Sequence, residues 1–332
     1  MAGPRLEQLL LPPGRPRETA TAPADGRSVL LGGETMGTNW SLEAIARPAL
    51  TDTVIRGALE TVFDRIIGQM SQWDAQSDLS RFNRATPGSR HRIADEFAYV
   101  LDCSLTIARA SSGAFDPTIG AVSELWGFGR SKPPVRKPSR EAAAAGRGYD
   151  WRNIELEEGG RVLGQPGGLT LDFSGIAKGF AVDAGVHALG RIGVDHALLN
   201  IGGELRGCGL RADGLPWWVD LEIPPDSPAP ATRVGLTGWS IATSGNYARR
   251  RGAGGQSWSH TIEPVSGLPL SDEILSVTVL HPGCMQADAL ATAIAVLGLD
   301  KGKRFADTNA IPARIITQSD VLESAAWARW AN

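Results

Sequence analysis

The chain has 332 residues, of which 42% are hydrophobic and 21% are charged, as in soluble globular proteins with a large core. Its formal net charge is −3 and its basic residues are scattered, so it lacks the concentrated positive surface that nucleic-acid binding requires. Its three cysteines lie far apart, which gives no zinc knuckle, redox dithiol or disulfide framework and is compatible with a reducing cytoplasm.

The N-terminal residues 1–27 show no apolar periodicity and are rich in Pro, Arg, Gly and Thr. We expect a flexible arm outside the core here, followed by one domain over 28–332. The apolar run Leu9 to Leu11 is far shorter than the h-region of about 7–15 residues in a signal peptide. No run approaches the about 20 apolar residues of a transmembrane helix. We therefore expect a cytoplasmic protein with no transmembrane segment, or a periplasmic one if a signal has been removed.

The first elements of the domain follow from apolar spacing. Trp40, Leu42 and Ala44 alternate with polar residues, which predicts a half-buried strand. Between residues 51 and 70 apolar pairs recur every three to four positions, which predicts an amphipathic helix. A second helix is predicted over 94–112, before a glycine that favours its end.

The second half of the chain is mostly strand-like. Residues 130–138 contain three prolines and are expected to form an exposed connection. Two helices are predicted, over 176–189 and 287–297. We therefore predict an α+β fold with a mixed, largely antiparallel sheet. Short apolar segments bounded by Gly and Pro predict the strands 169–173, 197–201, 217–223, 239–242, 258–262 and 276–280.

Asp288 and Thr292 lie four residues apart in the predicted helix 287–297, so their oxygens share one helix face and reach one ion. Carboxylate and hydroxyl oxygens, with phosphate and carbonyls completing the shell, suit Mg²⁺. The alternative is structural: Asp288 would stabilise the first turn of the helix and Thr292 would bond to its own backbone. On spacing alone the structural alternative is favoured.

Residues 171–179 run from an apparent strand through a glycine turn into a helix, a geometry at which backbone amides can meet phosphate. Lys178 would add a positive charge, or would simply face solvent. The segment is neither a Walker loop nor a Gly-x-Gly-x-x-Gly turn, so the two commonest nucleotide folds lose support. No nucleophile elbow surrounds Ser174 or Ser244, which argues against serine acyl chemistry.

His260 closes a predicted strand next to a proline turn. Histidine titrates in the range useful for proton transfer, although from the residues alone a structural hydrogen bond is the favoured role. Three loops carry aromatic side chains beside a carboxylate or glycines, at 70–74, 113–117 and 126–129. They could line a pocket for a flat ring, or pack in the core.

Taken in chain order, nine short segments resemble the motifs of the ApbE family of FAD:protein FMN transferases. This resemblance implies a T-fold-like flavin transferase domain of the α+β class. Glu263 stands where an aspartate is usual, and Trp73 stands where a tyrosine is frequent. The segments are MGT (36–38), MSQWDAQSDLSRFN (70–83), GAFDPT (113–118), WGFG (126–129), DFSGIAKG (172–179), NIGGE (200–204), TSG (243–245), HTIEP (260–264) with SG (266–267), and DALAT (288–292).

The resemblance also implies a site. Asp288 and Thr292 would bind Mg²⁺ with the carbonyls of Gly175 and Ala291, and His260 is the candidate proton acceptor. Thr243 belongs to the cofactor-binding set through its motif. The positions at which the family contacts FAD are Met36, Trp73, Ala114, Phe115, Asp116, Asp172, Lys178 and Ile262.

The implied reaction splits the pyrophosphate of FAD. Mg²⁺ would neutralise charge on the phosphates, a threonine hydroxyl of an acceptor redox protein would attack, FMN would stay attached and AMP would leave. Two alternatives remain open. Water could replace the acceptor, which would make the protein an FAD pyrophosphatase, or the domain could bind flavin without catalysis.

Overall fold

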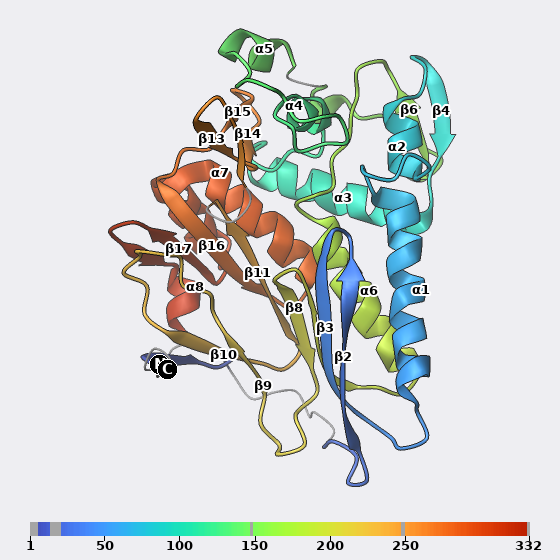
Figure 1. Ribbon diagram of the computed structural model, residues 1–332, viewed down its shortest axis with the longest axis vertical. Helices are drawn as coiled ribbons and strands as arrows, with labels where there is room; N and C mark the ends of the chain where they lie inside the picture. Colours follow the sequence, from blue (N-terminus) through green and yellow to red (C-terminus); the bar gives the residue numbers. More distant parts are fainter. Residues whose placement is uncertain (1–5, 14–20, 147–148, 247–249, 331–332) are drawn as a thin grey trace.

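The structure, a computed structural model, describes residues 6–13, 21–146, 149–246 and 250–330. Its centre is an eight-stranded antiparallel sheet with the strand order β18-β17-β16-β11-β8-β7-β3-β2 (Figure 1). The predicted α+β class with a largely antiparallel sheet is therefore confirmed. The strands are β2 (Arg27–Thr35), β3 (Thr38–Ala46), β7 (His196–Ile201), β8 (Glu204–Cys208), β11 (Trp239–Gly245), β16 (Ile274–His281), β17 (Ala313–Thr317) and β18 (Val321–Glu323).

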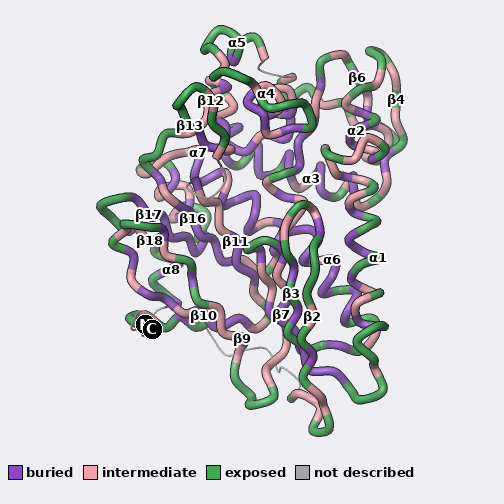
Figure 2. Tube along the Cα trace, viewed as in Figure 1, coloured by how far each residue is buried: buried purple, intermediate pink, exposed green. Residues whose placement is uncertain are grey.

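The two faces of this sheet bury different side chains, because neighbouring residues of a strand point to opposite sides. Leu199 and Ala242 pack into the large core beneath the helices. Their neighbours Leu198 and Ile241 pack into a second core on the other face. Both faces of the central strands are thus covered, and Figure 2 shows these strands largely buried.

The second core is closed by a small sheet, β1-β10-β9, and by helix α8 (Ala325–Ala328). Strand β1 (Gln8–Leu10) pairs in parallel with β10 (Thr232–Leu236), which pairs with β9 (Trp217–Asp220). Leu10 has no exposed surface. The expectation of an arm outside the core is therefore wrong for these three residues, and the rest of 1–27 lies partly outside the described residues.

Helices α6 (Ala177–Arg191) and α7 (Cys284–Thr308) lie on the other face of the sheet, where α6 packs on β7 and β8 and α7 packs on β11 and β16. The start of α7 is held by Asp183 of α6, whose carboxylate accepts the N–H groups of Cys284 and Met285 at 3.0 and 2.9 Å. These bonds satisfy amides that a helix N-terminus leaves without partners. The first turn of α7 is thereby fixed against the second turn of α6.

An outer layer of helices completes this side of the molecule (Figure 1). Helix α1 (Asp52–Met70) packs on α6, and α3 (Asp95–Ala110) packs on α7. None of the helices in the described residues combines the length and the apolar character needed to span a bilayer. The remaining elements are α2 (Asp78–Asn83), β4 (Ser89–Arg92), α4 (Gly120–Leu125), α5 (Arg140–Ala145), the 3-10 helix η1 (Trp151–Asn153), β5 (Leu156–Glu157), β6 (Val162–Gln165), β12 (Arg250–Ala253), β13 (Gln256–Ser259), β14 (Ile262–Glu263) and β15 (Leu268–Pro269).

Most predicted elements are confirmed. The helices predicted over 51–70, 94–112 and 176–189 correspond to α1, α3 and α6, and the helix over 287–297 forms the part of α7 before its interruption at Gly298. The strand predicted over 169–173 is wrong. Leu169, Leu171 and Phe173 are buried, but their segment is irregular backbone that packs between helices and loops rather than in a sheet.

Gly179 allows α6 and α7 to approach closely. A Cβ atom at this position would lie 2.7 Å from the carbonyl carbon of Cys284 and 2.9 Å from Cβ of Asp288. Gly179→Ala should therefore lower the free energy of unfolding by about 1–3 kcal/mol, because the backbone of α7 must shift.

Gly57→Ala in α1 is the control: nothing lies within 4 Å of its Cβ, so stability should rise by about 0.5–1 kcal/mol. Urea denaturation measures both, and equal effects would contradict the close approach.

Candidate active site

A cavity of about 670 Å³ opens where the irregular segments around α4 and before α6 meet the strands β8 and β11 and the helix α7. Its walls mix acidic, basic, hydroxyl and aromatic side chains. Of the predicted site residues, those that line it are Trp73, Ala114, Phe115, Asp116, Asp172, Gly175, Lys178, Thr243, His260, Ile262, Asp288 and Thr292.

Three residues of the predicted motifs lie elsewhere. Met36 forms the turn between β2 and β3, where it and Gly37 both have positive φ. Ala291 is fully buried in α7 and does not contribute to the cavity wall. Trp126 is also buried, with its indole N–H donating to the carbonyl of Gly267 at 2.8 Å. Trp126 is thus part of a core and not a cofactor wall.

At the floor of the cavity, α6 and α7 bring Lys178 and Asp288 together. The Lys178 ammonium lies 3.6 Å from Oδ2 of Asp288 and 2.7 Å from Oε1 of Glu204 in β8. Oδ2 of Asp288 also accepts the backbone N–H of Gly179 at 3.0 Å. Among the described residues, Lys178 and the Gly179 N–H contact the Asp288 carboxylate, and both contacts use Oδ2. Oδ1 is therefore available to a ligand.

Thr292 lies one turn further along α7. Its hydroxyl is hydrogen-bonded to the Ser244 hydroxyl at 3.1 Å, and a Cβ atom on Gly175 would lie 3.1 Å from Thr292 Oγ1. The backbone of the segment before α6 therefore approaches Thr292 directly. Thr243 points its hydroxyl toward Thr278 in β16, at 3.0 Å. Asp288, Thr292 and Gly175 thus converge, as a shared ligand set requires.

The chemistry of this set suits a hard divalent cation. In the described part of the chain no group of three or more His, Cys, Asp or Glu side chains could hold a metal, which is unlike a zinc site. Mg²⁺ is commonly bound through one or two carboxylates together with substrate phosphates. One carboxylate oxygen beside a hydroxyl, in a cavity that admits a large ligand, meets that requirement.

The segment before α6 is held in place by its own polar groups. Asp172 is 7% exposed and accepts the N–H of Ser174 at 2.8 Å, while its own N–H donates to the carbonyl of Pro117 at 2.9 Å. Gln72 donates to the Ser174 hydroxyl at 2.8 Å. These bonds tie the loop after α1 to the entrance of α6, so both segments present fixed groups to the cavity.

His260 also lines the cavity and lies between β13 and β14. Its ring makes an edge contact with Phe128, with 6.2 Å between the ring centroids. The loop that carries Phe128 is anchored where the Trp258 indole donates to the carbonyl of Trp126 at 3.1 Å. Trp73, in contrast, is 55% exposed at the cavity mouth. The cavity therefore has a fixed aromatic wall and one exposed aromatic side chain.

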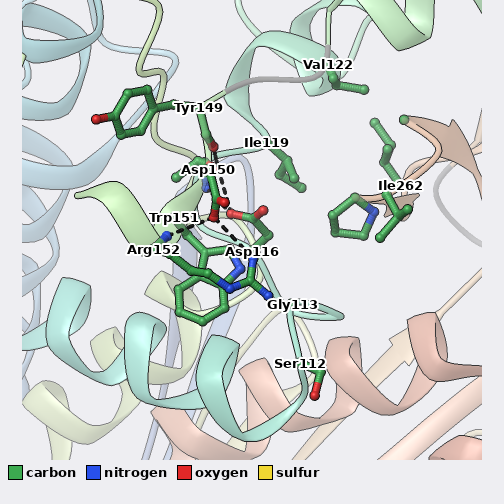
Figure 3. Close-up of a pocket in the computed structure, with 14 residues that line it drawn as sticks. Ser112, Gly113, Asp116, Ile119, Val122, Tyr149, Asp150, Trp151, Arg152 and Ile262 are labelled. Atoms are coloured by element: carbon green, nitrogen blue, oxygen red, sulfur yellow. Dashed lines mark hydrogen bonds and ion pairs between the residues drawn. The ribbon is translucent and has the colours of Figure 1, made fainter. Parts of the chain in front are cut away.

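A smaller cavity of about 320 Å³ adjoins the large one and shares Asp116, Ile119, Ile262 and Pro264 with it (Figure 3). Oδ1 of Asp116 accepts the amide and the hydroxyl of Thr118 at 2.8 and 2.7 Å. Burial raises the pKa of the Asp116 carboxyl, although the Thr118 hydrogen bonds oppose the shift and the charge of Asp150 adds to it. Asp116 is thus a partly buried carboxylate that lines both cavities.

Asp116→Asn should change how stability depends on pH. A carboxyl whose pKa is raised by folding stabilises the protein below its ordinary pKa of 3.8, and this contribution is lost as pH rises through the folded value. The Asp116→Asn variant has no carboxyl that titrates at this position. Its free energy of unfolding, relative to that of the parent, should therefore rise between about pH 4 and about pH 7.

Asp220→Asn is the control for that measurement, because the hydrogen bond from Arg233 lowers the pKa of Asp220, so its contribution is lost only as pH falls below 3.8 and the difference from the parent should change little between the two pH values. Urea unfolding at both pH values measures the two differences. A difference between Asp116→Asn and the parent that does not change with pH would contradict the raised pKa of Asp116.

The sequence did not assign roles to several residues of the large cavity. Glu204 ends the NIGGE segment, but only the structure pairs it with Lys178. Ser244 belongs to the TSG segment, but only the structure shows its hydrogen bond to Thr292. Arg250 and Arg251 also line the cavity, and Arg250 is paired with Asp272. These contacts join segments that are distant in the chain, so no local sequence pattern predicts them.

The fold and the cavity define an α+β protein with a large, polar ligand site, and comparisons with known proteins identify its relatives. The sequence profile of the ApbE family matches residues 36–315. The FAD:protein FMN transferase of Vibrio cholerae is 33% identical over 294 residues, which cover 88% of each chain. The Escherichia coli K12 protein of the same name is 31% identical over 294 residues, with 87% of this chain and 84% of the relative covered.

Solved structures agree. The apo flavinyl transferase ApbE of Pseudomonas stutzeri superposes with a TM-score of 0.84 at 30% identity, covering 92% of this chain and 97% of that one. The Vibrio cholerae flavin transferase ApbE gives 0.82 at 31% identity, covering 92% and 99%. The chain belongs to the ApbE family, as its motifs predicted.

Proposed function

We propose that this protein is a magnesium-dependent FAD:protein FMN transferase that attaches FMN, through its phosphate, to a threonine hydroxyl of an acceptor redox protein and releases AMP. The activity itself is that of the curated relatives. The cation is an inference from the residues of the cavity, and the acceptor threonine and the leaving AMP are inferences from the family resemblance.

The observation that carries the proposal is the meeting of α6 and α7 at the cavity floor. Asp288, Thr292 and Gly175 all line the cavity, and the backbone of Gly175 approaches the Thr292 hydroxyl one turn along α7 from Asp288. We assign Mg²⁺ to the Asp288 carboxylate and the Thr292 hydroxyl, with the carbonyl of Gly175 as a further ligand, and leave out Ala291, which is buried in α7 and does not line the cavity. Bound there, the cation would neutralise charge on the pyrophosphate oxygens as the bond between the two phosphates breaks.

The other walls supply binding and proton transfer. Lys178, at the start of α6, would bind a phosphate oxygen. Phe115 and Phe128 provide apolar surface for the flavin or adenine ring. A threonine hydroxyl needs a proton acceptor when it attacks phosphorus, and His260, which lines the cavity, is the candidate. The acceptor oxygen forms a bond to the FMN phosphorus, and the bond from that phosphorus to the AMP oxygen breaks.

Two other functions use the same cavity. Water in place of the threonine would give an FAD pyrophosphatase, and a cavity that fails to bind metal would give a flavin-binding module. The purified protein is incubated with FAD and Mg²⁺, with and without an acceptor flavoprotein and its Thr→Val variant at the target site. We expect the mass of FMN added to the acceptor, no addition to its variant, and AMP in equal amount. AMP without acceptor modification, or unchanged FAD, would reject the transferase.

A further inference from the structure

The floor of the cavity holds one ammonium group between two buried carboxylates. The side chains of Lys178, Glu204 and Asp288 are 14%, 4% and 5% exposed. The ammonium is at hydrogen-bond distance from Glu204, at 2.7 Å, and beyond it from Asp288, at 3.6 Å. The lysine is therefore anchored on Glu204, although Asp288 lies close enough to attract it.

Glu204 is itself set in a rigid position. It is the first residue of β8 and pairs with Ile201 at the end of β7. The two residues of the connecting turn, Gly202 and Gly203, both have positive φ, and the N–H of Gly203 donates to the Asn200 side chain at 2.9 Å. A two-residue turn of this kind fixes the register of the hairpin. The Glu204 carboxylate therefore approaches Lys178 from the sheet side.

We infer that Glu204 is a positioning residue that holds the Lys178 ammonium away from Asp288 and so leaves the Asp288 carboxylate to a divalent cation. This role rests on the proposed metal site. Glu204 and Asp288 are the two carboxylates that lie within 4 Å of the Lys178 ammonium among the described residues. If Glu204 loses its charge, Asp288 is the one that remains. In a buried site a direct lysine–aspartate pair is strong. The ammonium would then compete with the cation for Asp288.

The test is a double-mutant cycle read out as Mn²⁺ affinity, measured by electron paramagnetic resonance without FAD. Glu204→Gln keeps the size of the side chain and should weaken Mn²⁺ binding at least about tenfold. Lys178→Gln should bind Mn²⁺ at least as tightly as the parent. The combination of both substitutions should restore the parent affinity, because the competing ammonium is gone. Glu96→Gln, which removes one charge from the exposed pair with Arg65, should change nothing.

The possible results separate the two hypotheses. Mn²⁺ binding that Asp288→Ala does not affect would reject the proposed metal site, and the role of Glu204 with it. Binding that needs Asp288 but is unchanged in Glu204→Gln would reject the positioning role alone. Weak binding that persists in the double variant would also reject it, because general damage to the site is not repaired by removing Lys178. Thermal unfolding of each variant identifies any that fails to fold.

Discussion

Asp288→Ala should lower the rate of FMN transfer from FAD by about a thousandfold or more, because a bound cation contributes several kcal/mol to stabilising phosphoryl transfer. The substitution removes the one carboxylate that we assign to the metal, and the helix α7 tolerates alanine at this position. The side chain is buried between α6 and α7, where its Oδ2 accepts the N–H of Gly179 at 3.0 Å.

Stability must therefore be measured beside activity. Loss of the bond to Gly179 should cost about 1–3 kcal/mol, which does not explain a thousandfold loss in a folded protein. Thr292→Ser keeps the hydroxyl and should retain activity, whereas Thr292→Val should lose about tenfold or more. Transfer at the parent rate by Asp288→Ala, with an intact Mg²⁺ requirement, would contradict the metal assignment.

His260→Gln should lower FMN transfer by about 10²–10⁴-fold, the usual contribution of a general base. FAD affinity, measured from flavin fluorescence, should change little, because we assign His260 to the acceptor hydroxyl and not to FAD binding. The effect should therefore appear in the turnover rate and not in binding. A hydroxyl has a high pKa, so an unassisted threonine is a poor nucleophile near neutral pH.

His187→Gln provides the matched control for His260. His187 is exposed on α6 and does not line the cavity, so its loss should leave transfer unchanged. The pH dependence of transfer should lose its acidic limb in His260→Gln alone. Weaker FAD binding with an unchanged turnover rate would assign His260 to binding and not to proton transfer.

Much of the fold was predictable, because the burial of most segments follows from local periodicity. The alternation of Trp40, Leu42 and Ala44 predicted β3, and the apolar stripe over 51–70 predicted α1. The same reasoning misassigned 169–173, since an extended buried loop and a strand show the same alternation. It also missed β1, where three residues pair with a strand more than two hundred positions away. Such pairing depends on tertiary contacts.

The candidate site, like the fold, could be predicted only in part from the sequence. The spacing of Asp288 and Thr292 predicted that they share a helix face, and the family motifs brought the other residues into one set. No pattern predicted that Glu204 would share the ammonium of Lys178 with Asp288, because three separate elements supply the three side chains. The burial of Trp126 could not be predicted either, since an aromatic residue beside glycines suits a core as well as a pocket wall.

The most direct test of the metal assignment is a crystal structure of the protein with FAD and Mn²⁺, in which anomalous scattering locates the metal. We expect one peak bound to Asp288 Oδ1 and Thr292 Oγ1 and touching the pyrophosphate of FAD. A peak elsewhere, or a pyrophosphate remote from Asp288 and Thr292, would contradict the proposed mechanism.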